Sequence, residues 1–124
     1  MAGEWRRFCS GRKFAIEGDD IVVTLPGSRT HRVSVREEPD AYRLSSVVAR
    51  PAVVEQIVNL PIQSWERNRG TELAGFKIDS RGRLISESWI PKAGLTAAEF
   101  TLYLQSLASE ADRFEYQLTG RDSD

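Results

Sequence analysis

The chain has 124 residues, a size that suits one domain with its own core and leaves no room for two. Its formal net charge of −1 gives no strong attraction to nucleic acids or anionic membranes. Its single cysteine, Cys9, excludes an internal disulfide. No early apolar run is typical of a signal peptide or a membrane span, so we expect a cytoplasmic protein without membrane contact.

The first part of the chain predicts a short helix followed by strands. Trp5, Phe8 and Cys9 have the spacing of one helical face. Strand patterns bounded by turn residues follow at 14–16, 21–25, 30–37 and 42–49. Because tight turns join these segments, they must be antiparallel neighbours, and the sequence predicts a meander of three or four strands.

A helix is predicted next, where Pro51 is suited to a first helical position. Apolar residues then recur at helical spacing, at Val53, Val54, Ile57 and Val58. Pro61 should interrupt this helix near residues 59–60, since proline removes a helical hydrogen bond and clashes with the preceding turn. A new turn carrying Ile62 and Trp65 should follow.

The last part of the chain predicts a hairpin and a long helix. Segments 73–78 and 84–90 flank the turn residues 79–82. Thr96 and Glu99 form a capping box at the start of the final helix. Its apolar residues are spaced 4, 3, 4, 3 and 4 apart, at Phe100, Leu104, Leu107, Ala111, Phe114 and Leu118. Gly120 should end it, and residues 121–124 read as a loose tail.

Together these elements predict an α+β fold in the order α-β-β-β(-β)-α-β-β-α. An antiparallel sheet, made of the meander plus the hairpin, should carry the helices on one face. That face is the only large apolar partner available to the stripe of the final helix. Residues 1–120 should form one domain.

The sequence shows no recognisable catalytic machinery. His31 is the only histidine, so paired-His and His–Cys metal sites are excluded, and we interpret it as an exposed or hydrogen-bonded structural residue. Cys9 is interpreted as a packing thiol. No phosphate-binding loop, C-x-x-C or G-x-S-x-G motif occurs. We therefore expect a non-enzymatic protein without a metal or a cofactor.

Apolar residues exceed what one sheet face can bury. Strand 84–90 cannot place both the Ile85/Trp89 pair and the Leu84/Ile90 pair on the same face, so some apolar surface should lie opposite the main core. Such a surface suits a protein partner. The candidate partner-binding residues are Val47, Val48, Val54, Trp65 and Trp89.

This order of elements resembles type III secretion chaperones and the related YbjN-like proteins. The resemblance covers nearly the whole chain and is carried by 42–49, the helix after Pro51, the hairpin from Gly75–Ile78 to 84–85, and the helix 96–118. It implies a small, cytoplasmic, bacterial, often homodimeric protein that binds extended segments of partner proteins on apolar patches. The leading hypothesis is a peptide-binding or chaperone-like adaptor.

Two other functions stay open. A small ligand-binding domain or enzyme could use an Arg–carboxylate site, such as Arg43 or Arg50 with Glu55. Weak nucleic-acid binding is the third hypothesis, although acidic residues dilute the basic segment 67–69. A homodimer formed through the second helix or the hairpin edge is a separate expectation.

Overall fold

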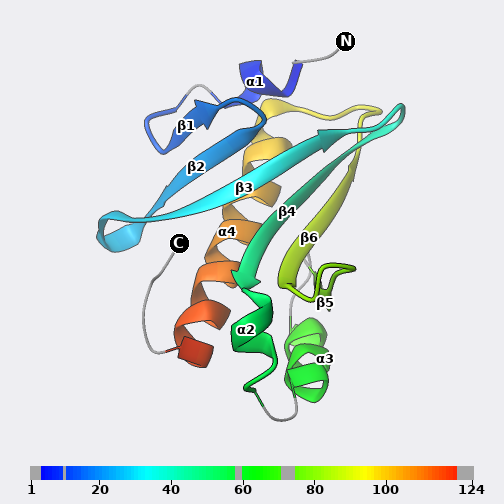
Figure 1. Cartoon of the computed structure of the whole chain (residues 1–124). Coiled ribbons are helices and arrows are strands. Elements are labelled where there is room, and N and C mark those ends of the chain that lie inside the picture. Colours follow the sequence, from blue (N-terminus) through cyan, green and yellow to red (C-terminus); the bar gives the residue numbers. More distant parts are fainter. Residues whose placement is uncertain (1–3, 10, 58–59, 71–74, 120–124) are drawn as a thin grey trace.

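A long helix, α4 (Ala97–Thr119), crosses one face of a six-stranded antiparallel sheet in the computed structural model (Figure 1). The structure describes residues 4–9, 11–57, 60–70 and 75–119. The earlier elements are α1 (Glu4–Phe8), β1 (Phe14–Glu17), β2 (Asp20–Leu25), a 3-10 turn (Pro26–Ser28), β3 (Arg29–Glu37), β4 (Ala41–Ala49), α2 (Pro51–Val54), α3 (Leu60–Gly70), β5 (Gly75–Ile78) and β6 (Leu84–Pro91). This order confirms the predicted α+β class.

The strands lie in the spatial order β1-β2-β3-β4-β6-β5, and every neighbouring pair is antiparallel. The meander therefore has four strands, the larger of the two predicted numbers. The hairpin joins it through its second strand, β6, which pairs with β4 from Ala41–Pro91 to Ala49–Leu84. β1 and β5 form the two edges of the sheet.

Alternation along the central strands decides which side chains meet α4. On β4, Tyr42, Leu44 and Val48 are buried, whereas Val47, which lies between Leu44 and Val48 in the strand, is exposed. On β6, Leu84 and Ile90 belong to the core, and Trp89 is exposed. Side chains alternate between the two faces of a strand, so the Leu84/Ile90 and Ile85/Trp89 pairs lie on opposite faces of the sheet, as predicted.

The core consists of two clusters that share α4. The first half of the helix, with Phe100 and Leu104, packs among residues of α1 and β2–β4, including Tyr42. The second half, with Phe114, packs among residues of β4–β6 and the start of α3. Edge-on aromatic contacts anchor both clusters, because the ring centroids are 5.7 Å apart for Tyr42–Phe100 and 4.8 Å apart for Phe76–Phe114.

The helix after Pro51 is shorter than the sequence predicts. α2 ends at Val54, and bonds from Gln56 N–H to the Val53 carbonyl and from Ile57 N–H to the Val54 carbonyl tighten the chain into a turn. Pro61 lies in the first turn of α3, where proline is tolerated, so it does not break a continuous helix. The expected break at 59–60, the start of the strand 73–78, the Gly120 stop and the tail 121–124 fall partly or wholly outside the described residues.

The capping box at the start of α4 forms as predicted. Glu99 N–H donates to Thr96 Oγ1 at 3.2 Å, and Thr96 N–H donates to Glu99 Oε1 at 3.0 Å. These bonds satisfy two backbone donors that a helix start otherwise leaves without intrahelical partners.

Replacing Thr96 with alanine should lower the free energy of unfolding by about 1 kcal/mol, because the cap hydroxyl is lost. Urea denaturation followed by circular dichroism measures this change. Thr101→Ala is the matched control, since the Thr101 hydroxyl only bonds back to the Ala97 and Ala98 carbonyls within the helix. Equal destabilisation by both substitutions would show that the capping box does not stabilise α4.

Candidate functional site

The sheet divides between β3 and β4 partway along these strands. They pair from Glu37–Tyr42 to Ser34–Ser45. Beyond that point β3 pairs only with β2, and β4 pairs only with β6, so the two strands diverge toward the C-terminal half of α4 (Figure 1). Ser46 Oγ still donates to the Arg32 carbonyl at 2.7 Å, which bridges the start of the division.

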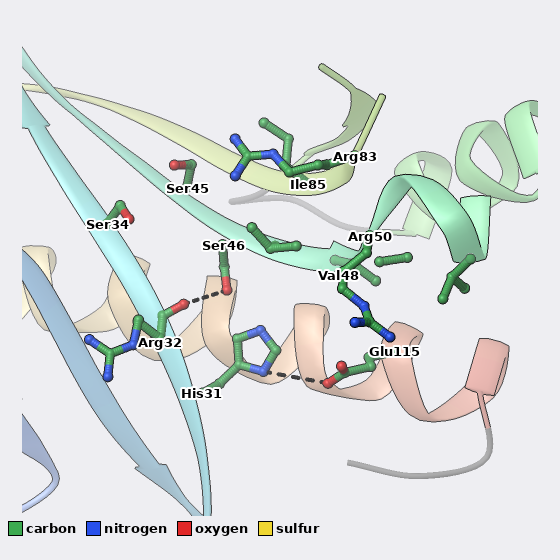
Figure 2. Close-up of a pocket in the computed structure, with 13 residues that line it drawn as sticks. His31, Arg32, Ser34, Ser45, Ser46, Val48, Arg50, Arg83, Ile85 and Glu115 are labelled. Atoms are coloured by element: carbon green, nitrogen blue, oxygen red, sulfur yellow. Dashed lines mark hydrogen bonds and ion pairs between the residues drawn. The ribbon is translucent and has the colours of Figure 1, made fainter. Parts of the chain in front are cut away.

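A pocket of about 460 Å³ occupies this division, and we call it the β3–β4 pocket (Figure 2). β3, β4, β6, the start of α2 and α4 all contribute to its wall. The lining residues are His31, Arg32, Ser34, Ser45, Ser46, Val47, Val48, Ala49, Arg50, Val53, Arg83, Ile85 and Glu115.

The lining of the β3–β4 pocket combines apolar side chains with three guanidinium groups. Val47 and Ile85 are cross-strand partners and form part of the apolar wall. Arg32 belongs to β3, Arg50 directly precedes α2, and Arg83 directly precedes β6. This composition can accept an aliphatic side chain and pair with carboxylates around it.

Acidic neighbours hold two of these arginines in place. Arg32 lies 2.9 Å from Glu17 and 3.3 Å from Asp20, and hydrogen bonds to these carboxylates raise the pKa of Arg32. Arg83 Nη2 lies 2.7 Å from Asp79 Oδ2. Both guanidinium groups are therefore positioned before any ligand arrives.

Asp79 organises the β5–β6 turn that carries Arg83. Its carboxylate accepts hydrogen bonds from the backbone N–H groups of Arg81 and Arg83, each at 2.9 Å. Burial acts to raise the pKa of Asp79, but the hydrogen bonds from Arg83 and from this backbone outweigh burial and lower it. Gly82 completes the turn with a φ of +79°, which favours glycine.

A buried polar group that we call the His–Asp–Glu cluster lies at the inner side of the β3–β4 pocket, where two of its members, His31 and Glu115, line the pocket. It consists of His31 from β3 and Asp112 and Glu115 from α4. His31 Nδ1 lies 3.9 Å from Asp112 Oδ1 and 4.0 Å from Glu115 Oε1, and Figure 2 shows the imidazole directed toward Glu115. Arg29 forms an ion pair with the other oxygen of Asp112.

His31 differs from its sequence interpretation. Its side chain is only 1% exposed, and Nδ1 makes no hydrogen bond to any of the described residues. Asp112 and Glu115 were not among the residues predicted from the sequence. The available signal was their i, i+3 spacing beside the apolar stripe of α4, which places both carboxylates on one side of the helix.

The structure separates the five candidate partner-binding residues. Val47 (38% exposed) and Trp89 (52%) lie on the sheet face opposite α4, while Trp65 (60%) lies on α3. Val48 is buried against α4 because neighbouring strand residues point to opposite faces, and it is accessible only from the β3–β4 pocket that it lines. Val54 is half-buried at the end of α2.

A row of ion pairs accompanies Trp89 on the outer face of the sheet. Arg43, the cross-strand partner of Trp89, lies 3.1 Å from Glu38 and 3.4 Å from Glu87, and Lys77 lies 3.1 Å from Glu87. The hydrogen bond from Arg43 is the main cause that lowers the pKa of Glu38. Trp89 therefore projects from a surface of fixed, alternating charge.

The remaining sequence candidates do not combine into a reactive site. Among the described residues, Glu55 forms no ion pair with Arg43 or Arg50, and the predicted Arg–carboxylate site is not assembled. Cys9 is a buried packing thiol, and burial raises its pKa to about 11. At neutral pH this thiol is almost entirely protonated and a poor nucleophile.

Comparisons with known proteins support the fold. No protein-family model matches the chain, and no curated protein matches it. A chain of the ExsC–ExsE complex matches with a TM-score of 0.56 and 17% identity, covering 84% of this chain and 80% of that one. A chain of the HopA1–SchA chaperone–effector complex matches with a TM-score of 0.56 and 10% identity, covering 90% and 87%.

This protein has a type III secretion chaperone-like fold. The likeness spans most of both neighbours, and it confirms the resemblance to secretion chaperones predicted from the order of elements. The YbjN-like part of that resemblance stays a prediction. Within the described part of the chain, no helix combines the length and the apolar character needed to cross a membrane.

Replacing Asp79 with asparagine should destabilise the protein by about 1 kcal/mol at pH 7, because the charge-assisted bond to Arg83 is lost. The folded-state pKa of Asp79 is lowered, so its ionised form stabilises the protein above about pH 4, and this contribution is lost as the pH falls further. The difference between wild type and variant in urea denaturation should therefore shrink below pH 4. Asp40→Asn, in the β3–β4 turn, is the control, and a difference independent of pH would contradict the assignment.

Proposed function

We propose that this chain is a non-enzymatic, chaperone-like adaptor that binds an extended segment of another protein. The segment would lie along the outer face of the sheet, over Val47 and Trp89, and enter the β3–β4 pocket. The likeness to chains from two protein–protein complexes supports a protein partner. The proposed location remains the cytoplasm.

The opening of the β3–β4 pocket onto the outer face of the sheet at Val47 carries this proposal. Val47 belongs both to the exposed outer face and to the pocket lining, and its cross-strand partner Ile85 lines the pocket too. Trp89 lies on the same face, two residues beyond Glu87 on β6, so Glu87 lies between Trp89 and the pocket residue Ile85. An extended peptide that places alternate side chains toward the sheet would meet Trp89 and the pocket in succession.

The charge of the β3–β4 pocket favours acidic residues beside the apolar anchor of the partner. Arg32, Arg50 and Arg83 line the pocket, and Glu115 is the one carboxylate among its described lining residues. Arg32 and Arg83 already pair with acidic neighbours, so Arg50 contributes most of the remaining positive charge. Arginine pairs with carboxylates in a bidentate geometry, which adds specificity to an apolar contact. The expected segment therefore contains an aliphatic or aromatic residue with aspartate or glutamate near it.

The proposed site can be tested by selecting peptides from a random display library on the purified chain. Selected peptides should combine an apolar anchor with acidic neighbours, and Val47→Asp and Trp89→Ala should each weaken their binding at least about tenfold, the loss typical of an interface anchor. Fluorescence polarisation with labelled peptides measures the affinity.

Leu102→Ala is the matched control for these substitutions. Leu102 is 56% exposed and lies on α4, away from the outer face of the sheet, so its loss should leave the affinity unchanged. Failure to select any peptide that binds saturably, or equal binding by all three variants, would reject the proposed site.

We also propose that the chain forms a homodimer through α3 and the edge strand β5. Ile62 and Trp65 are 56% and 60% exposed on α3, and Ile78 is 42% exposed on the adjoining β5. An unpaired edge strand next to exposed apolar residues is a surface that a second copy can cover.

Trp65→Glu should shift the chain to a monomer, because it places a charge in this interface. Sedimentation at several protein concentrations measures the change in mass. Leu102→Glu tests a residue of similar exposure outside the interface and should leave the dimer intact. A wild-type mass that stays monomeric at all concentrations would rule out the dimer without affecting the peptide-binding test.

A further inference from the structure

The His–Asp–Glu cluster brings three metal-binding atom types together in the interior. The side chains of His31, Asp112 and Glu115 are 1%, 2% and 6% exposed. One imidazole nitrogen and two carboxylate oxygens lie within 4.8 Å of one another. Among the described residues, His31 Nδ1 has no hydrogen-bond partner, although it is buried and lies 3.9 Å from Asp112 Oδ1 and 4.0 Å from Glu115 Oε1. Buried polar atoms of this kind normally have a partner.

The spacing of the three atoms is close to that of a coordination site. A triangle with sides of 3.9, 4.0 and at most 4.8 Å has its centre within about 2.5 Å of each corner. Zinc takes histidine nitrogen and carboxylate oxygen at about 2.0–2.2 Å. Each ligand would need to move inward by only a few tenths of an ångström, which side-chain rotation of Asp112 and Glu115 can supply.

The surroundings of the cluster also suit a cation. Two carboxylates buried this close to each other repel, and a positive charge between them lowers that cost. Arg29 forms its ion pair with Asp112 through Oδ2, which leaves Oδ1 directed toward His31. In metal sites, a carboxylate that binds the ion through one oxygen is commonly oriented by a hydrogen bond or ion pair to its other oxygen.

We propose that His31 Nδ1, Asp112 Oδ1 and Glu115 Oε1 bind a divalent transition-metal ion; zinc, which takes both imidazole nitrogen and carboxylate oxygen, is the ion used to test the site. The ion would tie β3 to α4 where the sheet divides. Because His31 and Glu115 line the β3–β4 pocket, a fourth coordination position would face this pocket and hold water. The assignment departs from the sequence expectation of no metal and is independent of the proposed adaptor function.

The full, untagged chain allows a direct test because His31 is its only histidine. Its imidazole resonances, followed by NMR during titration with zinc chloride in phosphate-free buffer, should shift and saturate at one equivalent. Zinc should also raise the melting temperature, since an ion bound only by the folded state stabilises it. Glu115→Gln and Asp112→Asn should each weaken zinc binding at least about tenfold.

Glu110→Gln is the matched control, because Glu110 lies on the same helix and pairs with Arg67 and Arg113 outside the cluster. This variant should bind zinc like the wild type. Circular dichroism verifies that the Asp112 and Glu115 variants are folded, and His31→Gln provides a third variant that retains both carboxylates. The proposal is wrong if the imidazole resonances respond to pH but not to zinc, or if zinc binds equally well to Glu115→Gln and Glu110→Gln.

Discussion

Burial of the apolar stripe of α4 is the interaction on which the rest of the fold depends. Its first half packs with Phe100 and Leu104 among β2, β3 and β4, and its second half packs with Phe114 among β4, β6 and β5. No other described helix takes part in both clusters of the core. The helix therefore holds the two parts of the sheet together at the position where β3 and β4 no longer pair.

The division of the sheet follows from this arrangement. Adjacent strands are rotated relative to each other, so a six-stranded sheet twists strongly, whereas α4 crosses it as one continuous helix. β3 remains with β2 and β4 remains with β6, and the ladder between β3 and β4 stops at Ser34–Ser45. One geometric feature thus creates both the β3–β4 pocket and the buried polar wall behind it.

Local pattern was sufficient to predict most elements and their order. The capping box of Thr96 and Glu99 fixed the start of α4, and alternation in 84–90 correctly assigned the two faces of β6. The helix after Pro51 is shorter than predicted, because helical spacing of Val53 and Ile57 does not by itself show where a helix ends. Pro61 lies in the first turn of the separate helix α3, which starts at Leu60. The same alternation rule, applied to β4, would have assigned Val48 to the core.

The candidate site was harder to predict because its parts are brought together only by tertiary structure. Asp112 and Glu115 are ordinary helix residues in sequence, and His31 lies in a distant strand among arginines. Nothing local indicates where β3 and β4 separate, so neither the pocket nor the meeting of these side chains could be inferred from spacing.

The two walls of the β3–β4 pocket differ in their energetic cost. Exposed Val47 in the outer wall costs little in a monomer, since isolated apolar residues are common on protein surfaces. Burial of His31, Asp112 and Glu115 on the inner side is expensive, because desolvation of charged groups often exceeds what their mutual attraction returns. Well-packed apolar residues at buried positions of this kind avoid that cost. The polar wall is therefore poorly explained by folding stability, and its position beside an accessible pocket favours a binding role for these side chains.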